Sequence, residues 1–171
     1  NVNNSGLIDA TNDLVITGAL TIPSTATGLV VTGAGSLTLN GALTINATSA
    51  LNQPVIGGAG LLVTNGTSTI NGGQLHVDTR DWNNFGPMTF GGRVTFDNGV
   101  VLTNKSGATL TLGGTNGTPL AQGVGTGNAL INAGTLNQIS TATQTIAFAF
   151  DNSGVVNVNS GILALSGGGT H

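Results

Sequence analysis

This 171-residue sequence has very little charge. Charged residues make up 5% of the chain, whereas an average globular domain has roughly 25%. Only three residues are Lys or Arg, too few for the phosphate contacts that a duplex-binding protein needs. All six acidic residues are Asp, and the formal net charge is −3. The composition therefore argues against an ordinary α/β enzyme and against a nucleic-acid partner.

The chain also lacks cysteine, tyrosine and any long apolar run. Without cysteine there is no disulfide framework and no thiol chemistry. No apolar stretch approaches the roughly 18 to 20 residues of a transmembrane helix, so we expect no transmembrane segment. Disorder is disfavoured, because hydrophobic residues make up 39% of the chain and recur in alternation. The sequence begins at Asn1 without methionine, which we interpret as a processed or excised piece of a longer protein.

The sequence does contain a repeated short pattern, Gly-x-Leu-x-(Leu/Ile/Val), set among Gly, Asn and Thr. Alternation over a few residues predicts a strand with one face inward, and Asn-Gly or Gly-Gly pairs predict tight corners. In the stretch 57–78 the alternations are Leu61-x-Val63 and Leu75-x-Val77. Further copies lie at 18–22, 35–39, 41–45, 92–96, 109–112, 154–158 and 161–165.

Two all-β architectures fit strands that recur about every 6 to 12 residues, namely a sandwich and a solenoid. Internal repetition favours the solenoid, because each of its coils presents the same small set of aliphatic residues inward. We predict a β-solenoid with about 20 residues per coil and roughly eight coils. Such a rod would be roughly 40 Å long. A β-sandwich that acts as an interaction module is the alternative.

Two segments, GAGSLTLNG (33–41) and GTSTINGGQLHV (66–77), resemble the two halves of the autotransporter-associated β-strand repeat. Residues 58–63 resemble a second opening of that repeat, and residues 150–169 resemble another copy. The resemblance implies a right-handed parallel β-helix in an exported passenger or adhesin-type protein. The chain departs from the repeat at 81–88 and 113–127, and we expect both segments to be loop insertions.

The charged residues gather in one part of the predicted coil. If Leu75 and Val77 face inward, the residues that alternate with them face outward beside the outward residues of 92–97, one coil further on. The candidate binding residues collected in this way are His76, Asp78, Arg80, Asp81, Trp82, Arg93 and Asp97. One interpretation is a saccharide site with a Trp platform and an acid/base pair. The other is a solvated face whose charges neutralise one another.

We expect no catalytic residue, no metal site and no cofactor. Two or three Asp without Glu are a thin basis for polysaccharide cleavage, and His76 as the only internal histidine cannot build a multi-histidine zinc site. An ice-binding face would need a regular outward Thr-x-Thr array, which we do not find in the sequence.

Our main hypothesis is a structural or adhesive β-helical rod that displays loops at the bacterial cell surface. Its expected partner is the continuation of the same solenoid or a copy stacked end to end, with a polysaccharide or a host-surface ligand as a further partner. The alternative is a β-helix that binds or cleaves carbohydrate at the charged patch beside Trp82.

Overall fold

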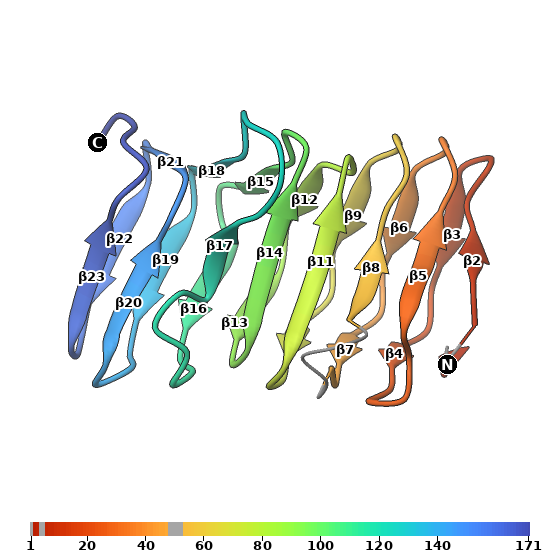
Figure 1. Ribbon diagram of the computed structural model, residues 1–171, viewed down its shortest axis with the longest axis horizontal. Helices are drawn as coiled ribbons and strands as arrows, with labels where there is room; N and C mark the ends of the chain where they lie inside the picture. Colours follow the sequence, from red (N-terminus) through yellow and green to blue (C-terminus); the bar gives the residue numbers. More distant parts are fainter. Residues whose placement is uncertain (1, 4–5, 48–52) are drawn as a thin grey trace.

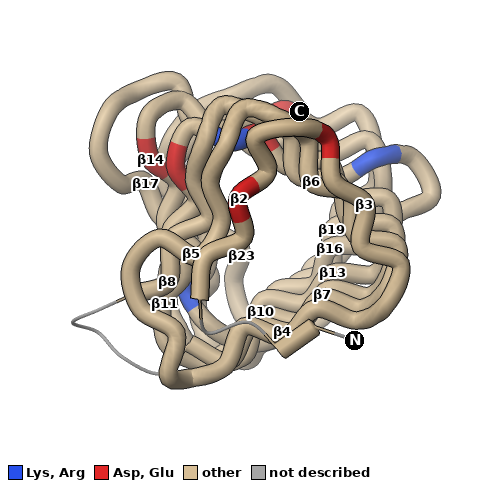
Figure 2. Tube along the Cα trace, turned by 90° about the vertical axis from the view of Figure 1, so that its right-hand side faces the viewer, with Lys and Arg blue, Asp and Glu red and all other residues tan. Residues whose placement is uncertain are grey.

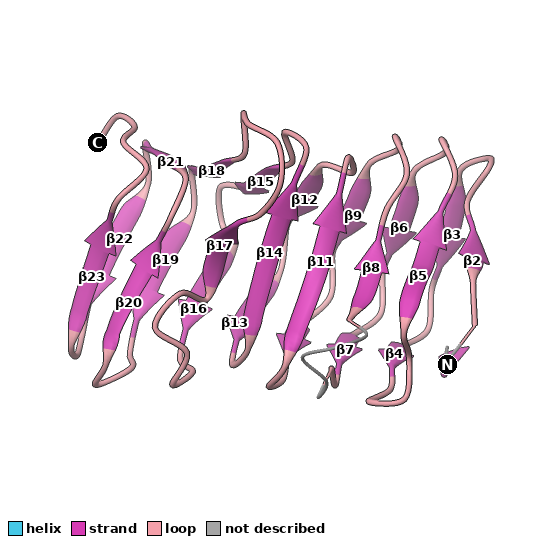
Figure 3. Cartoon of the chain, in the orientation of Figure 1, coloured by secondary structure: helices cyan, strands magenta, loops and turns pink. Residues whose placement is uncertain are grey.

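A computed structural model describes residues 2–3, 6–47 and 53–171 of the chain (Figure 1). These residues form 23 strands and no helix (Figure 3). No helix that is long and apolar enough to cross a membrane therefore occurs in this part of the chain. The strands form three sheets in which neighbours run parallel, so the antiparallel sandwich is excluded. The predicted all-β solenoid is confirmed, with about 7 turns of about 22 residues each.

Consecutive strands join different sheets, and every third strand is therefore a neighbour in space. Sheet A contains β1 (Val2–Asn3), β4 (Leu20–Ile22), β7 (Leu43–Ile45), β10 (Ser68–Ile70), β13 (Pro87–Phe90), β16 (Thr109–Leu112), β19 (Thr135–Gln138) and β22 (Val155–Val158). Sheet B contains β2 (Ile8–Asp9), β5 (Gly28–Thr32), β8 (Pro54–Ile56), β11 (Gln74–Asp78), β14 (Arg93–Asp97), β17 (Leu120–Gln122), β20 (Thr143–Ile146) and β23 (Ile162–Leu165). Sheet C contains β3 (Leu14–Ile16), β6 (Leu37–Leu39), β9 (Leu62–Thr64), β12 (Trp82–Asn84), β15 (Val101–Asn104), β18 (Ala129–Asn132) and β21 (Ala149–Asn152).

The coil is right-handed. In the view from its N-terminal end (Figure 2), the chain passes clockwise from β5 to β6 to β7 and then to β8 as it recedes from the viewer. This is the hand that crossover connections between parallel strands nearly always take.

The core is a set of stacked inward-facing columns. In sheet A, for example, Leu20 pairs with Leu43 and Leu110 pairs with Leu136, and all four side chains are buried. The spacing is 23 residues in the first pair and 26 in the second. Coil length therefore varies while the register of the inward residues is kept, because the extra residues are placed in the corners.

Glycine recurs where corners of successive coils touch. A Cβ added at Gly66 would lie 2.4 Å from the carbonyl oxygen of Gly41, and one at Gly41 would lie 2.2 Å from that of Gly18. Any side chain at these positions would force adjacent coils apart. In this column the glycine precedes the first inward residue of a sheet A strand by two positions, as Gly41 precedes Leu43. The repeated Gly-x-Leu pattern follows from this geometry.

The segment 81–88 is not a loop insertion, so that prediction is wrong. It contains β12, in register with β9 and β15, and the start of β13. The side chains of Trp82 and Asn84 are fully buried in β12, at inward positions that β6 fills with Leu37 and Leu39. The apolar alternation is absent from the sequence here because a Trp and a buried amide replace two leucines.

The segment 113–127 is only partly an insertion. Strand β17 lies in its middle, and the surplus residues of this long coil are divided between the corners on either side of β17 (Figure 1). The face predicted for Leu61-x-Val63 is also wrong by one residue. Leu62 and Thr64 are buried in β9, whereas Val63 lies between them on the outer face.

Candidate functional site

The outer face of sheet B brings together part of the predicted charged patch. Strands β11 and β14 are adjacent, with His76 opposite Thr95 and Asp78 opposite Asp97. His76 Nδ1 lies 2.6 Å from Asp97 Oδ2, and this is the one hydrogen-bonded contact between a basic and an acidic side chain among the described residues. The side chain of His76 is 31% exposed, but that of Asp97 is only 8% exposed. The two outward rows thus adjoin as the coil spacing predicts.

Asp97 also fixes the corner that follows β17. Its Oδ1 accepts a hydrogen bond of 2.7 Å from the backbone N–H of Val124. The backbone N–H of Gly123 donates to the carbonyl oxygen of Phe96, and that of Asn98 donates to Val124. Asp97 therefore joins β11, β14 and the next coil, and both of its oxygens are engaged.

The other two acidic side chains of the patch also bond to a neighbouring coil. Asp78 Oδ1 accepts from the side-chain amide of Asn98 at 2.8 Å. Asp81 Oδ1 accepts from the backbone N–H of Val101 at 2.9 Å. Arg93 lies opposite Gln74 on β11, and its Nε has no hydrogen-bond partner among the described residues. The carboxylates thus connect coils, and Arg93 is the cationic group of the patch.

Arg80 is not part of this surface, although alternation predicts an outward side chain. Thr79 adopts a positive φ of 58°, which ends the alternation and turns the next side chain inward. Arg80 is fully buried and donates hydrogen bonds to three carbonyl oxygens of preceding corners: Nε to Gly57 at 2.8 Å, Nη1 to Gly35 at 3.0 Å and Nη2 to Gly33 at 2.7 Å. Burial lowers the pKa of this guanidinium. Arg80 is thus a structural clamp.

Trp82 cannot serve as a saccharide platform, because its side chain is fully buried in the core. Its Nε1–H donates to Thr64 Oγ1 at 3.0 Å, and Thr64 donates in turn to Asn84 Oδ1 at 3.2 Å. The indole therefore begins a buried polar network. The saccharide interpretation of the charged patch therefore loses its aromatic platform.

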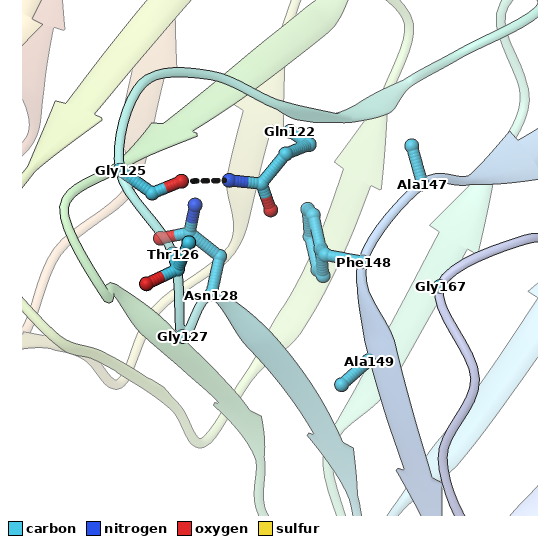
Figure 4. Close-up of a pocket in the computed structure, with 9 residues that line it drawn as sticks. All are labelled: Gln122, Gly125, Thr126, Gly127, Asn128, Ala147, Phe148, Ala149 and Gly167. Carbon is cyan, nitrogen blue, oxygen red and sulfur yellow. Dashed lines mark hydrogen bonds between the residues drawn. The ribbon is translucent and has the colours of Figure 1, made fainter.

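The structure also contains a groove that the sequence did not indicate (Figure 4). Strands β17 and β20 pair only through Leu120 and Ile146, so the two coils separate beyond this point. The resulting open space has a volume of about 370 Å³ and is lined by Gln122, Gly125, Thr126, Gly127, Asn128, Ala147, Phe148, Ala149 and Gly167. The glycine-rich composition of 113–127 was the one available sign, and we interpreted it as a loop.

The groove has amide groups on one wall and apolar groups on the other. The Gln122 side chain donates to the Gly125 carbonyl oxygen at 3.0 Å, which closes the corner on itself. Asn128 donates to the Phe96 carbonyl oxygen at 2.8 Å and accepts from the Val100 N–H at 2.7 Å. Phe148, on the opposite wall, packs edge-on against Phe96 with ring centres 5.2 Å apart. None of the lining residues carries a charge.

Metal binding and glycoside cleavage each require a particular arrangement of the described residues. No group of three or more His, Cys, Asp or Glu side chains that could hold a metal ion occurs among them. Glycoside cleavage needs two carboxylates on either side of a bound sugar, whereas Asp78 and Asp97 both accept hydrogen bonds from their own protein.

The chain matches no protein-family model, no curated protein and no solved structure. The likeness to the autotransporter-associated repeat therefore rests on the sequence segments described above. The functional argument rests on the geometry of this molecule.

Proposed function

We propose that this chain is a stiff β-helical segment of a bacterial secreted or cell-surface protein, where it presents surface corners in an adhesive role. The supporting observation is that the charged side chains with the chemistry for a binding or catalytic site, such as Arg80 and Asp97, instead bond one coil to the next. Arg80 connects three successive coils, and Asp97 connects the last of these to the next two. In this proposal the chain is not an enzyme, and its function lies in its shape and its surface.

A rod requires that each coil be held to its neighbours. Backbone pairing in three sheets supplies most of this, and buried side chains pack in columns through all of them. The corner after β17 stands out from the stack (Figure 1), and Val124 at this corner is 66% exposed. Hydrogen bonds to Phe96 and Asp97 hold this corner in one conformation, so it is displayed in a fixed position.

Limited proteolysis tests the rod. Trypsin is uninformative, because the chain has only three Lys or Arg and Arg80 is buried. Within the described residues, proteinase K, which cleaves after many residue types, is expected to leave the strands intact and to cut at the long corners on either side of β17. Early cleavage inside the strands of sheet A or B would contradict a stiff rod.

The adhesive role needs a separate measurement. Beads coated with the purified chain are expected to be retained under flow on cell-derived or polysaccharide-coated surfaces better than beads coated with albumin. Equal retention would remove adhesion from the proposal and leave a spacer. End-to-end association is tested by light scattering over a range of concentrations, where a mass that stays monomeric would exclude it.

The groove supports a second candidate function, the binding of a neutral saccharide. Ligand-observed NMR with neutral and acidic oligosaccharides is the appropriate assay, because the buried Trp82 cannot report on ligands. Ala147→Trp is expected to fill the groove and abolish the signal. Ala164→Trp, on the outer face of β23, is the matched control and is expected to keep it. Absence of binding by the unmodified chain would end this candidate.

A further inference from the structure

The outer face of sheet A carries one threonine per coil in a straight row. The backbone register places Thr21 beside Thr44, Thr44 beside Thr69, Thr69 beside Thr89 and Thr89 beside Thr111. These pairings have no register shift, whereas sheet B has a bulge in β5. Neighbouring strands in a sheet lie about 4.8 Å apart, so the five side chains repeat at this interval. We call these five residues the threonine row.

The hydroxyl groups of the threonine row are not used by the protein. Within the described residues, no hydrogen bond engages the side chain of any of the five. The row continues into Asn137 and Asn157, and there the two amides bond to each other at 2.9 Å. Hydroxyl groups about 4.8 Å apart are too distant for a direct hydrogen bond. The threonine row must therefore find its partners outside the protein.

This face has no charge. None of the sheet A strands contains Asp, Lys or Arg, and the wall that carries β7, β10, β13, β16 and β19 shows neither colour of charge in the end view (Figure 2). A second, partial row flanks the first, since Thr109 of β16 lies beside Thr135 of β19. The outward Thr-x-Thr pattern that we did not find in the sequence thus occurs in β16. Because the coils differ in length, the other threonines of the row do not recur at a fixed spacing in the sequence.

We propose that the outer face of sheet A binds ice through the threonine row. Ice is an uncharged lattice of hydrogen-bond donors and acceptors, and a threonine hydroxyl offers one donor and two acceptor sites. The branched side chain is restricted at χ1, so the hydroxyls are held in a repeating arrangement. Their interval is close to the repeat of equivalent oxygen atoms along the a axis of hexagonal ice.

Other ligands fit this face less well. A charged polymer would find no counter-charge in the sheet A strands, whose outward residues are uncharged. Sugar rings are commonly held against aromatic side chains, and Phe90, the aromatic residue of these strands, is fully buried. Ice, which is a rigid periodic lattice, matches the regular spacing of the threonine row. This inference is independent of the adhesive role and of the groove.

The test is a freezing measurement on the purified full chain. A single ice crystal in its solution is expected to become faceted and to show a gap between melting and freezing temperatures, and recrystallisation of fine ice is expected to slow. Thr69→Lys, at the centre of the row, is expected to abolish both effects. Thr69→Val, which removes the hydroxyl but keeps the shape, is expected to reduce the gap. Circular dichroism confirms that each variant is folded.

Thr38→Lys is the matched control, because Thr38 is a half-buried outward threonine in the middle of a sheet C strand. It is expected to keep the freezing gap in full. The proposal is overturned if the unmodified chain shows neither faceting nor a gap, or if Thr38→Lys removes the gap as completely as Thr69→Lys. It is also overturned if light scattering shows a dimer that Thr69→Lys dissociates, since the face would then belong to a second copy.

Discussion

The two halves of the solenoid differ in the buried side chains at the ends of the sheet C strands. In the N-terminal coils the last inward position of each strand is aliphatic, with Ile16 followed by Leu39. The next coil has Thr64 at this position, and all later coils in sheet C have asparagine. The register aligns these asparagines in one column: Asn84, Asn104, Asn132 and Asn152.

The asparagine column is a hydrogen-bonded ladder. The Nδ2 of each residue donates to the Oδ1 of the next, at 2.9 Å from Asn84 to Asn104, 2.8 Å from Asn104 to Asn132 and 2.7 Å from Asn132 to Asn152. The amides also donate to corner carbonyls, as Asn84 does to Gly86 at 2.8 Å. Buried amides are tolerated here because nearly every polar atom has a partner.

The N-terminal coils have no such ladder at this position, and their buried polar connection, Arg80, lies at the other end of the sheet C strands, in the corner before β12. Its guanidinium reaches back to corners in two earlier coils, through Gly57 and Gly35. In the first half Arg80 bonds to the corners before the sheet C strands, and exposed amide pairs such as Asn40–Asn65 also join coils. In the second half four asparagines form a ladder at the other end of these strands. We expect the two arrangements to differ in how they tolerate mutation, because one depends on a single residue.

The largest effect is expected at Arg80. Arg80→Met leaves at least three buried carbonyl oxygens without donors, and we expect it to lower the free energy of unfolding by about 3–5 kcal/mol. Urea denaturation followed by circular dichroism measures this. Arg93→Met, on the outer face of β14, is the control and should cost less than about 1 kcal/mol. Similar losses for the two variants would mean that Arg80 is not a clamp.

A smaller loss is expected for a single step of the ladder. Asn104→Leu removes the bonds to Asn84 and Asn132, and we expect it to cost about 2–3 kcal/mol because a buried donor and a buried acceptor lose their partners. Asn157→Leu breaks an exposed amide pair with Asn137 and should change stability by less than about 0.5 kcal/mol. If Asn104→Leu is neutral, the aliphatic and amide arrangements are interchangeable at this edge.

The corner columns offer a third test. Gly66→Ala places a Cβ 2.4 Å from the Gly41 carbonyl oxygen. We therefore expect the coils to separate locally, at a cost of about 2 kcal/mol in the free energy of unfolding. Gly113→Ala is the matched control, because the Cβ there meets only the Ile139 side chain at 3.4 Å. Differential scanning fluorimetry should show a lower Tm for the first variant alone. Equal Tm values would show that the corner at Gly66 accommodates a Cβ without loss of stability.

The smallest effect concerns acid at the C-terminal end. Asp151 Oδ1 accepts from the hydroxyl and the N–H of Thr170, at 2.7 Å and 2.9 Å, and these bonds lower the pKa of this carboxyl below its ordinary 3.8. A carboxyl with a lowered folded-state pKa stabilises the fold above its unfolded pKa, and the contribution is lost as pH falls through the folded value. The protection of the Thr170 amide against exchange, relative to an unstructured peptide at the same pH, should therefore fall below pH 3.8. Asp151→Asn should show less protection at neutral pH and lose this pH dependence.

The sequence predicts the repeating parts of the fold well. Inward leucines such as Leu43 and Leu110 lie in the predicted strands, because most coils place the same residue type at the same buried position. The stacking of β11 on β14 also follows from the coil spacing. Local alternation and internal repetition are sufficient to predict the strands wherever successive coils follow the same pattern of inward residues.

The candidate site was predicted less well, for reasons that lie in particular residues. Thr79 reverses the alternation through a positive φ, so Arg80 is buried although it follows an outward series. Trp82 and Asn84 occupy inward positions without an aliphatic pattern, which gave their strand the appearance of a loop. The groove depends on how far two coils separate beyond Leu120, and a linear sequence does not contain that distance.

Variable coil length has a consequence for how such a chain can change over time. The same column is continued after 23 residues at Leu43 and after 26 at Leu136, with no shift of its inward residues. An insertion at a corner therefore alters the exterior of one coil and leaves the other coils unaffected. Natural variation or peptide grafting can therefore change the surface of one coil at a time without changing the core.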